Sequence, residues 1–132
     1  MKQIMISERN LKQFAVMVVA CFALMSTQNV FAGDTALTTD EVIELISGKT
    51  VHGTSSRGKK YKMYFGEDNS LIARNGKTGK WEVKDGSVCN TWDDRGFAGC
   101  DKVYRKDNGK IFYKVSSGKK GKFRKFEAGN KL

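Results

Sequence analysis

Aromatic rings placed beside lysines are the residues of this chain best suited to binding chemistry. Alternate residues of an extended strand face the same side, so the segments 62–64, 102–106 and 110–114 each set one ring next to lysine. Rings stack on planar or sugar groups, and ammonium groups attract anions. If these strands are neighbours, one outer face carries the candidate ligand-binding residues Lys62, Tyr64, Lys102, Tyr104, Lys106, Lys110, Phe112 and Lys114. The alternative is that lysine stems simply cover outward rings.

Residues that could carry catalysis or hold a metal are few. His52 is the only histidine, which excludes a multi-histidine metal site. The adjacent acids Glu67-Asp68 and Asp93-Asp94 offer too few oxygen ligands for calcium. We therefore expect no metal, no cofactor and no enzymatic activity.

One enzyme class keeps a set of candidate residues. A small, basic, secreted ribonuclease needs a histidine, a carboxylate and arginines around the scissile phosphate. His52 could serve with Glu67 or Glu82 and with Arg57 or Arg74. Their spacing selects none of them, so this is the last of three functional alternatives.

The stretch from Trp81 to Cys100 holds both tryptophans and the only two cysteines outside the apolar N-terminus. In an oxidising compartment a Cys89–Cys100 disulfide is favoured over two free reactive thiols. We predict that this bond closes and stiffens the loop that follows Trp92. Trp92, at the mouth of that loop, is a further candidate contact residue.

The first 32 residues have the three parts of a secretory signal. Lys2, Arg9 and Lys12 supply a positive start, and an apolar run follows over 14–25. That run is shorter than the ~20 residues of a membrane-spanning helix. Small residues in Val30-Phe31-Ala32 predict cleavage after Ala32.

A second interpretation of this segment leads to a lipid anchor. Val18-Val19-Ala20-Cys21 resembles a lipobox, which would leave Cys21 as a lipidated N-terminus. Against it, the apolar run continues past Cys21 to Met25, so ordinary cleavage is the preferred interpretation.

The domains expected are therefore a signal peptide over 1–32 and a single exported, mainly-β domain over 33–132, in the periplasm or outside the cell. Cleavage removes three of the 24 basic residues and one of the 14 acidic residues, so the domain carries 21 minus 13, or +8. Such a charge favours anionic partners.

A short helix is predicted at the start of the domain. Thr38 and Glu41, three residues apart, form a capping box, and Gly48 suits the residue after a helix end. The apolar stripe consists of Val42, Ile43, Leu45 and Ile46. We predict an amphipathic helix over 39–47, packed on a sheet.

After Gly48 the apolar pattern has a period of two, with turn residues about every ten positions. Short sequential strands with tight turns predict an antiparallel meander. The fold class is α+β, mainly β: one short helix, then seven or eight strands in a bent sheet or small open barrel. The expected strands are 50–53, 60–66, 70–74, 80–84, 87–92, 102–106, 110–115 and 121–126.

The alternation also predicts which side chains form the core. Each strand has one apolar face, and its other face carries charged residues. The predicted core residues are Tyr61, Met63, Phe65, Trp81, Val83, Ile111, Tyr113 and Val115.

Several short motifs extend over most of the chain after residue 38. They are Tyr64-Phe65-Gly66-Glu67-Asp68-Asn69-Ser70-Leu71, Gly79-Lys80-Trp81, Cys89-Asn90-Thr91-Trp92, Cys100 and Val103-Tyr104. This set resembles an uncharacterised family of small exported proteins of Gram-negative bacteria. The chain departs from that pattern at Asn69, where glycine is preferred, and at Val88, where leucine is preferred. The resemblance implies an exported β-domain with a disulfide and carries no activity.

The function expected from these features is a non-enzymatic periplasmic or secreted binding protein. Its basic, aromatic face would engage lipopolysaccharide, another anionic polysaccharide or an acidic protein. The alternative from a second class is an exported protein–protein inhibitor or immunity-type protein. The export signal argues against nucleic acid as the partner, and we expect a monomer with no transmembrane segment.

Overall fold

The computed structural model describes residues 33–132 as one helix and nine strands. The proposed signal peptide over 1–32, including Cys21, lies outside the described residues. The elements are β1 (Thr35–Ala36), α2 (Thr39–Ile46), β2 (Lys49–Thr54), β3 (Lys60–Phe65), β4 (Ser70–Ala73), β5 (Thr78–Lys84), β6 (Ser87–Trp92), β7 (Gly96–Arg105), β8 (Ile111–Lys114) and β9 (Lys120–Ala128).

Helix α2 begins at the predicted capping box and ends at Ile46, one residue before the predicted end. The Glu41 backbone N–H donates to Thr38 Oγ1 over 3.3 Å, and the Thr38 backbone N–H donates to Glu41 Oε1 over 3.2 Å. These bonds satisfy two otherwise unpaired backbone donors, and they lower the pKa of Glu41. Gly48, at a positive φ of 70°, follows the last turn. The buried face of the helix is formed by Val42 and Ile46, and Leu45 packs beside them. Ile43, the fourth residue of the predicted stripe, is exposed.

Eight antiparallel strands close into a barrel, with a ninth short strand outside it. Each strand from β2 to β8 pairs with the next along the chain, and β9 also pairs with β2. β1 pairs with β7. The predicted mainly-β meander with one helix is confirmed, and the barrel is closed.

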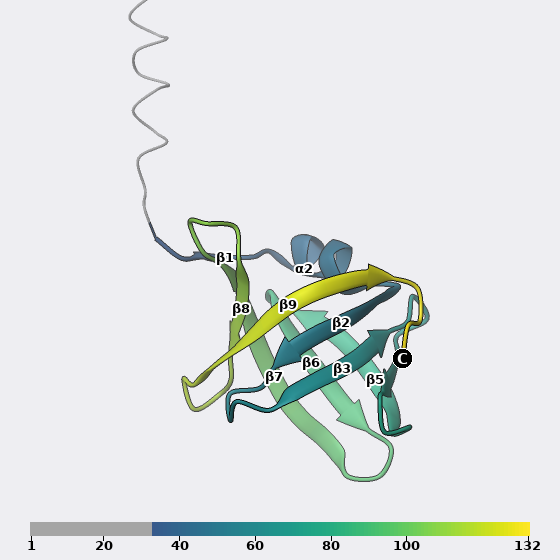
Figure 1. The fold of residues 1–132 in the computed structure, drawn as a ribbon. Coiled ribbons are helices and arrows are strands. Elements are labelled where there is room, and N and C mark those ends of the chain that lie inside the picture. The colour runs from purple at the N-terminus through teal and green to yellow at the C-terminus, as the bar shows by residue number, and fades with distance from the viewer. Residues whose placement is uncertain (1–32) are drawn as a thin grey trace, which may run out of the picture. The chain divides into compact units, whose positions relative to one another are not determined.

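The two ends of the barrel differ. α2 packs against β2, β5 and β6 at one end, where Thr39 Oγ1 accepts a bond of 3.0 Å from the Gly86 N–H. The turns that join β2 to β3, β6 to β7 and β8 to β9 lie at the opposite end (Figure 1). One end is therefore covered by the helix and the other is formed by hairpin turns.

The core has the composition that the alternation predicts. Phe65, Trp81, Ile111 and Tyr113 are buried. The other four predicted residues, Tyr61, Met63, Val83 and Val115, are partly buried and pack against this cluster.

The disulfide is present, but the predicted loop is not. Cys89 and Cys100 are bonded and lie directly opposite each other on β6 and β7. Strand β7 begins at Gly96, where Gly96 already pairs with Trp92. The bond therefore joins two strands of one hairpin, and the prediction of a stapled loop after Trp92 is wrong.

Candidate functional site

Two rings lie face to face on the outside of the barrel. Tyr104 on β7 and Phe112 on β8 are cross-strand partners, with ring centroids 5.2 Å apart and planes 12° from parallel. The ammonium groups of Lys106 and Lys120 lie 5.5 and 5.1 Å from the Phe112 centroid. That of Lys114 lies 5.0 Å from the Tyr104 centroid. Each distance is within the range of a cation–π contact.

We call this surface the lysine face. It consists of outward side chains from β7, β8 and β9 and from the turn between β7 and β8. Its members are Lys102, Tyr104, Lys106, Lys110, Phe112, Lys114, Lys120 and Lys122. Lys120 and Lys122 were not among the predicted residues, because the pairing of β9 with β8 could not be deduced from the sequence.

The rings of this face are not equally available. Phe112 is only 2% exposed although it lies outside the main core cluster, whereas Tyr104 is half-buried. Lysine side chains cover the Phe112 ring, as the alternative interpretation of the sequence proposed. A ligand would therefore meet ammonium groups and Tyr104 before it met Phe112.

The charges of the lysine face are not neutralised by neighbouring acids. Among residues 33–132, none of its ammonium groups lies within 4.0 Å of a carboxylate. Lys114 is the direct cross-strand partner of both Lys102 and Lys120. Like charges placed opposite each other destabilise a sheet, so an anion on this face would relieve an existing repulsion.

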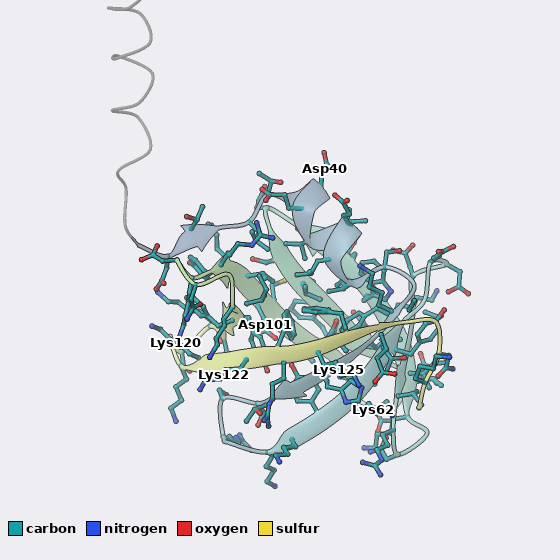
Figure 2. The ribbon with its side chains drawn as sticks, turned by 45° about the horizontal axis from the view of Figure 1, so that its top comes forward. Asp40, Lys62, Asp101, Lys120, Lys122 and Lys125 are labelled. Carbon is teal, nitrogen blue, oxygen red and sulfur yellow. A yellow bond between two sulfur atoms is a disulfide. The ribbon has the colours of Figure 1, made fainter. Side chains whose placement is uncertain are left out.

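Lys62 and Tyr64 do not belong to this face. They lie on β3, which is separated from β8 by β2 and β9. Lys62 pairs with His52 and Tyr64 pairs with Thr50. The prediction that all three ring-and-lysine segments share one face is therefore wrong for β3. Figure 2 shows Lys120 and Lys122 at one side of the barrel and Lys62 and Lys125 toward the other.

Trp92 is also placed differently from the prediction. Its side chain is 7% exposed and belongs to the core cluster. The guanidinium carbon of Arg95 lies 5.3 Å from the centroid of its ring. Trp92 is therefore no exposed contact on a loop, although it is among the residues that line a cavity.

That cavity, which we call the barrel cleft, has a volume of about 1040 Å³. Its lining includes Tyr61, Met63 and Trp92 and the polar residues His52, Lys62 and Lys125. Half of all its lining residues are lysine or arginine, and none is aspartate or glutamate.

The strand pattern explains why inward and outward side chains line the same cleft. β4 ends at Ala73, the partner of Met63, whereas β3 extends back to Lys60. Between Met63 and Lys60, the edge of β3 that faces β4 makes one further backbone hydrogen bond, which the Arg74 N–H donates to the Lys62 carbonyl over 3.1 Å. Past that bond both faces of β3 border the cleft.

The single histidine is held by a carboxylate that sequence reasoning missed. His52 Nε2 lies 2.7 Å from Glu127 Oε1, and Lys125 Nζ lies 3.1 Å from the same oxygen. Lys125 and then His52 lower the pKa of Glu127 through these contacts. Glu127 follows His52 by 75 residues, so only the β2–β9 pairing brings them together.

The residues proposed for a ribonuclease do not assemble. Arg74 lines the cleft with His52. Glu67 instead lies against Gly48, Glu82 bonds Lys84 over 3.2 Å, and Arg57 lies in the turn between β2 and β3. Of the predicted partners of His52, the structure therefore brings only Arg74 to the same cleft.

Polar groups also face the barrel interior beside the cleft. Burial raises the pKa of Tyr61 far above its ordinary value, and Tyr113 and Asp101 add to the rise. Burial likewise raises the pKa of Asp101. On the neighbouring strand, Asn90 Oδ1 is buried without a hydrogen-bond partner in the part of the chain that the structure describes.

In residues 33–132 no three His, Cys, Asp or Glu side chains are grouped so as to hold a metal ion. No helix in that part has the length and apolar character needed to cross a bilayer. Neither protein-family models, curated proteins nor solved structures gave a match to the chain. The resemblance noted from the sequence stays a prediction.

Proposed function

We propose that this protein is a non-enzymatic, exported binding protein whose lysine face holds an anionic polymer of the cell envelope. The polymer we propose is lipopolysaccharide or another acidic polysaccharide. Exported here means periplasmic or secreted, as the signal-like segment over 1–32 predicts.

One observation carries the proposal. The six lysines of the lysine face have no carboxylate partner within 4.0 Å in residues 33–132, and three of them lie over the Tyr104–Phe112 stack. Cation–π contacts favour these ammonium positions in the absence of ligand. A surface prepared in this way loses less side-chain entropy when an anion binds.

The layout of the lysines suits a polymer. Cross-strand lysines are about 5 Å apart at the backbone, and alternate lysines along one strand are about 7 Å apart. A chain with repeated acidic groups could contact several of them at once, and such multivalent contacts strengthen binding without any single strong contact.

The lysines of this face attract anions and its rings stack on flat groups, and we propose no bond-breaking step for them. Lysine at neutral pH is a cation with three donors and no free electron pair. The proposed activity is therefore retention of an anionic polymer.

The test compares two triple variants of equal charge. One carries Lys106→Gln, Lys114→Gln and Lys120→Gln in the lysine face. The control carries Lys80→Gln, Lys84→Gln and Lys131→Gln, which lie outside both the lysine face and the barrel cleft. Affinity for immobilised lipopolysaccharide and for an acidic polysaccharide is measured at rising salt concentration.

We expect the lysine-face variant to bind at least tenfold more weakly and the control to change less than threefold. Wild-type binding should weaken as salt shortens the range of charge attraction. Equal losses in the two variants would overturn the proposal. Absence of polymer binding, together with a stoichiometric protein partner that resists high salt, would favour the inhibitor or immunity-type alternative instead.

A further inference from the structure

We infer that the barrel cleft is a second binding site, for a small organic anion that joins a flat, apolar body to a phosphate, sulfate or carboxylate group. The site is separate from the lysine face and does not depend on the function proposed for that face. The cleft combines a ligand-sized volume with a charged wall and an apolar wall.

The cleft has the size and position of a ligand site. Its volume of about 1040 Å³ is at the upper end of the range of small-molecule pockets. The interior of an eight-stranded barrel is just wide enough to be filled by side chains or to hold one small ligand. α2 packs at one end of the barrel, and the lining of the cleft includes residues of the turns that follow β4 and β6.

The charged wall is a row of side chains across three adjacent strands. His52 on β2 is the direct partner of Lys62 on β3 and of Lys125 on β9. Arg74 continues this row at the end of β4. Glu127, beside the row, accepts hydrogen bonds from His52 and Lys125 through one carboxylate oxygen. Its single negative charge offsets only part of the positive charge of the row. Lys62, Arg74 and Arg124 have no carboxylate within 4.0 Å among the described residues.

The apolar wall is already in place. Tyr61 lies over Gly53, where any larger side chain would collide with its ring, and its hydroxyl is 3.0 Å from that of Tyr113. Met63 and Trp92 complete this wall. A rigid aromatic surface and an adaptable thioether suit a flat apolar body, which needs little reorganisation to bind.

The two walls together define the ligand. A free inorganic anion would use only the charged row and leave the Tyr61–Met63–Trp92 surface in water. A neutral apolar ligand would leave the lysines and arginines unmatched. A molecule with both parts buries the apolar surface and neutralises the row, so it should bind more tightly than either part alone.

The test uses 1-naphthyl phosphate as the probe and NMR of the purified protein as the readout. The ring of His52, the only histidine, gives a single reporter on the charged row. The indole N–H of Trp92 reports on the apolar wall. The Trp81 indole, which donates to the Gly66 carbonyl over 2.9 Å in the core, serves as the internal reference.

We expect the His52 and Trp92 signals to move together and to saturate at one equivalent, while the Trp81 signal stays in place. Inorganic phosphate should bind at least tenfold more weakly than 1-naphthyl phosphate. Lys62→Gln with Lys125→Gln should weaken the probe at least tenfold. The matched control, Lys106→Gln with Lys120→Gln in the lysine face, should leave its affinity within twofold.

Three results would overturn the inference. They are the absence of saturable binding, equal affinity for inorganic phosphate and 1-naphthyl phosphate, and equal weakening by the control variant. Arg74→Gln is a second variant of the charged row, for use if the double variant fails to fold. It too should weaken the probe, and an unchanged affinity would count against the site.

Discussion

The hydroxyl groups of Tyr61 and Tyr113 meet inside the barrel, 3.0 Å apart, although the residues are 52 positions apart in the chain. Tyr61 donates to Tyr113, which in turn donates to the Thr54 carbonyl over 3.4 Å. β3 and β8, which carry the tyrosines, are separated by β2 and β9. The pair therefore links strands that share no backbone hydrogen bond, next to the cleft.

Removing the two hydroxyl groups should have unequal effects. Tyr113→Phe leaves the largely buried Tyr61 hydroxyl without its partner, and we expect a loss of about 1–3 kcal/mol in the free energy of unfolding. Tyr61→Phe leaves Tyr113 bonded to Thr54, so about 0.5–1.5 kcal/mol should be lost. Urea unfolding of both variants measures the difference. An equal loss, or the reverse order, would show that this chain of bonds is not intact in solution.

Phe112 should contribute to stability although it faces away from the main core. Because its ring is 2% exposed under lysine stems, we expect Phe112→Ala to cost about 3–5 kcal/mol in the free energy of unfolding. Phe97, which is 67% exposed on β7, is the matched control, and Phe97→Ala should stay within about 0.5 kcal/mol. Similar small losses in both variants would mean that the lysines do not cover Phe112 in solution.

Local patterns were sufficient to predict the helix, most of the barrel strands and their inner faces, but they did not predict β1 or the start of β7. The capping box at Thr38 depends on residues three positions apart, and the alternation from Tyr61 to Phe65 depends on neighbours within one strand. Both are short-range signals that a sequence states directly.

The candidate sites depend on pairings between distant segments, which these patterns do not contain. Nothing near Lys62 shows that β2 and β9 separate it from Phe112. Glu127 contacts His52 only because the C-terminal strand returns to β2. The sequence predicts a loop after Trp92 because glycines interrupt the alternation in 96–101, so the pattern does not indicate that β7 begins at Gly96.

The disulfide should stabilise the β6–β7 hairpin without being required for its formation. Cys89 and Cys100 are partners in a ladder that continues on both sides, from Ser87–Lys102 to Trp92–Gly96. Replacing both by alanine should lower the free energy of unfolding by about 2–3 kcal/mol, chiefly through the entropy of the unfolded chain. Urea unfolding of the double variant should match that of the reduced wild type. A double variant that is unfolded at 25 °C would mean that the ladder depends on the bond.

Asp101 should make stability depend on pH in a direction opposite to that of most carboxylates. Burial raises its pKa in the folded state, so the folded protein holds the proton more tightly than the unfolded chain does. At pH values below the ordinary pKa of aspartate, Asp101 is neutral in both the folded and the unfolded state, and burial of a charge then takes nothing from the free energy of unfolding. As pH rises from there through the raised folded value, the ionised group increasingly destabilises the fold.

Asp101→Asn should therefore raise the free energy of unfolding at pH 7, by less than about 1 kcal/mol because solvent still screens this partly exposed group. The gain should shrink as pH falls and be absent near pH 3. Asp34→Asn makes the same change in net charge at an exposed position and should give no such gain. Urea unfolding of both variants between pH 3 and pH 7 measures these changes in the free energy of unfolding. A gain that persists at pH 3, or that Asp34→Asn reproduces, would show that burial of the Asp101 carboxylate is not its cause.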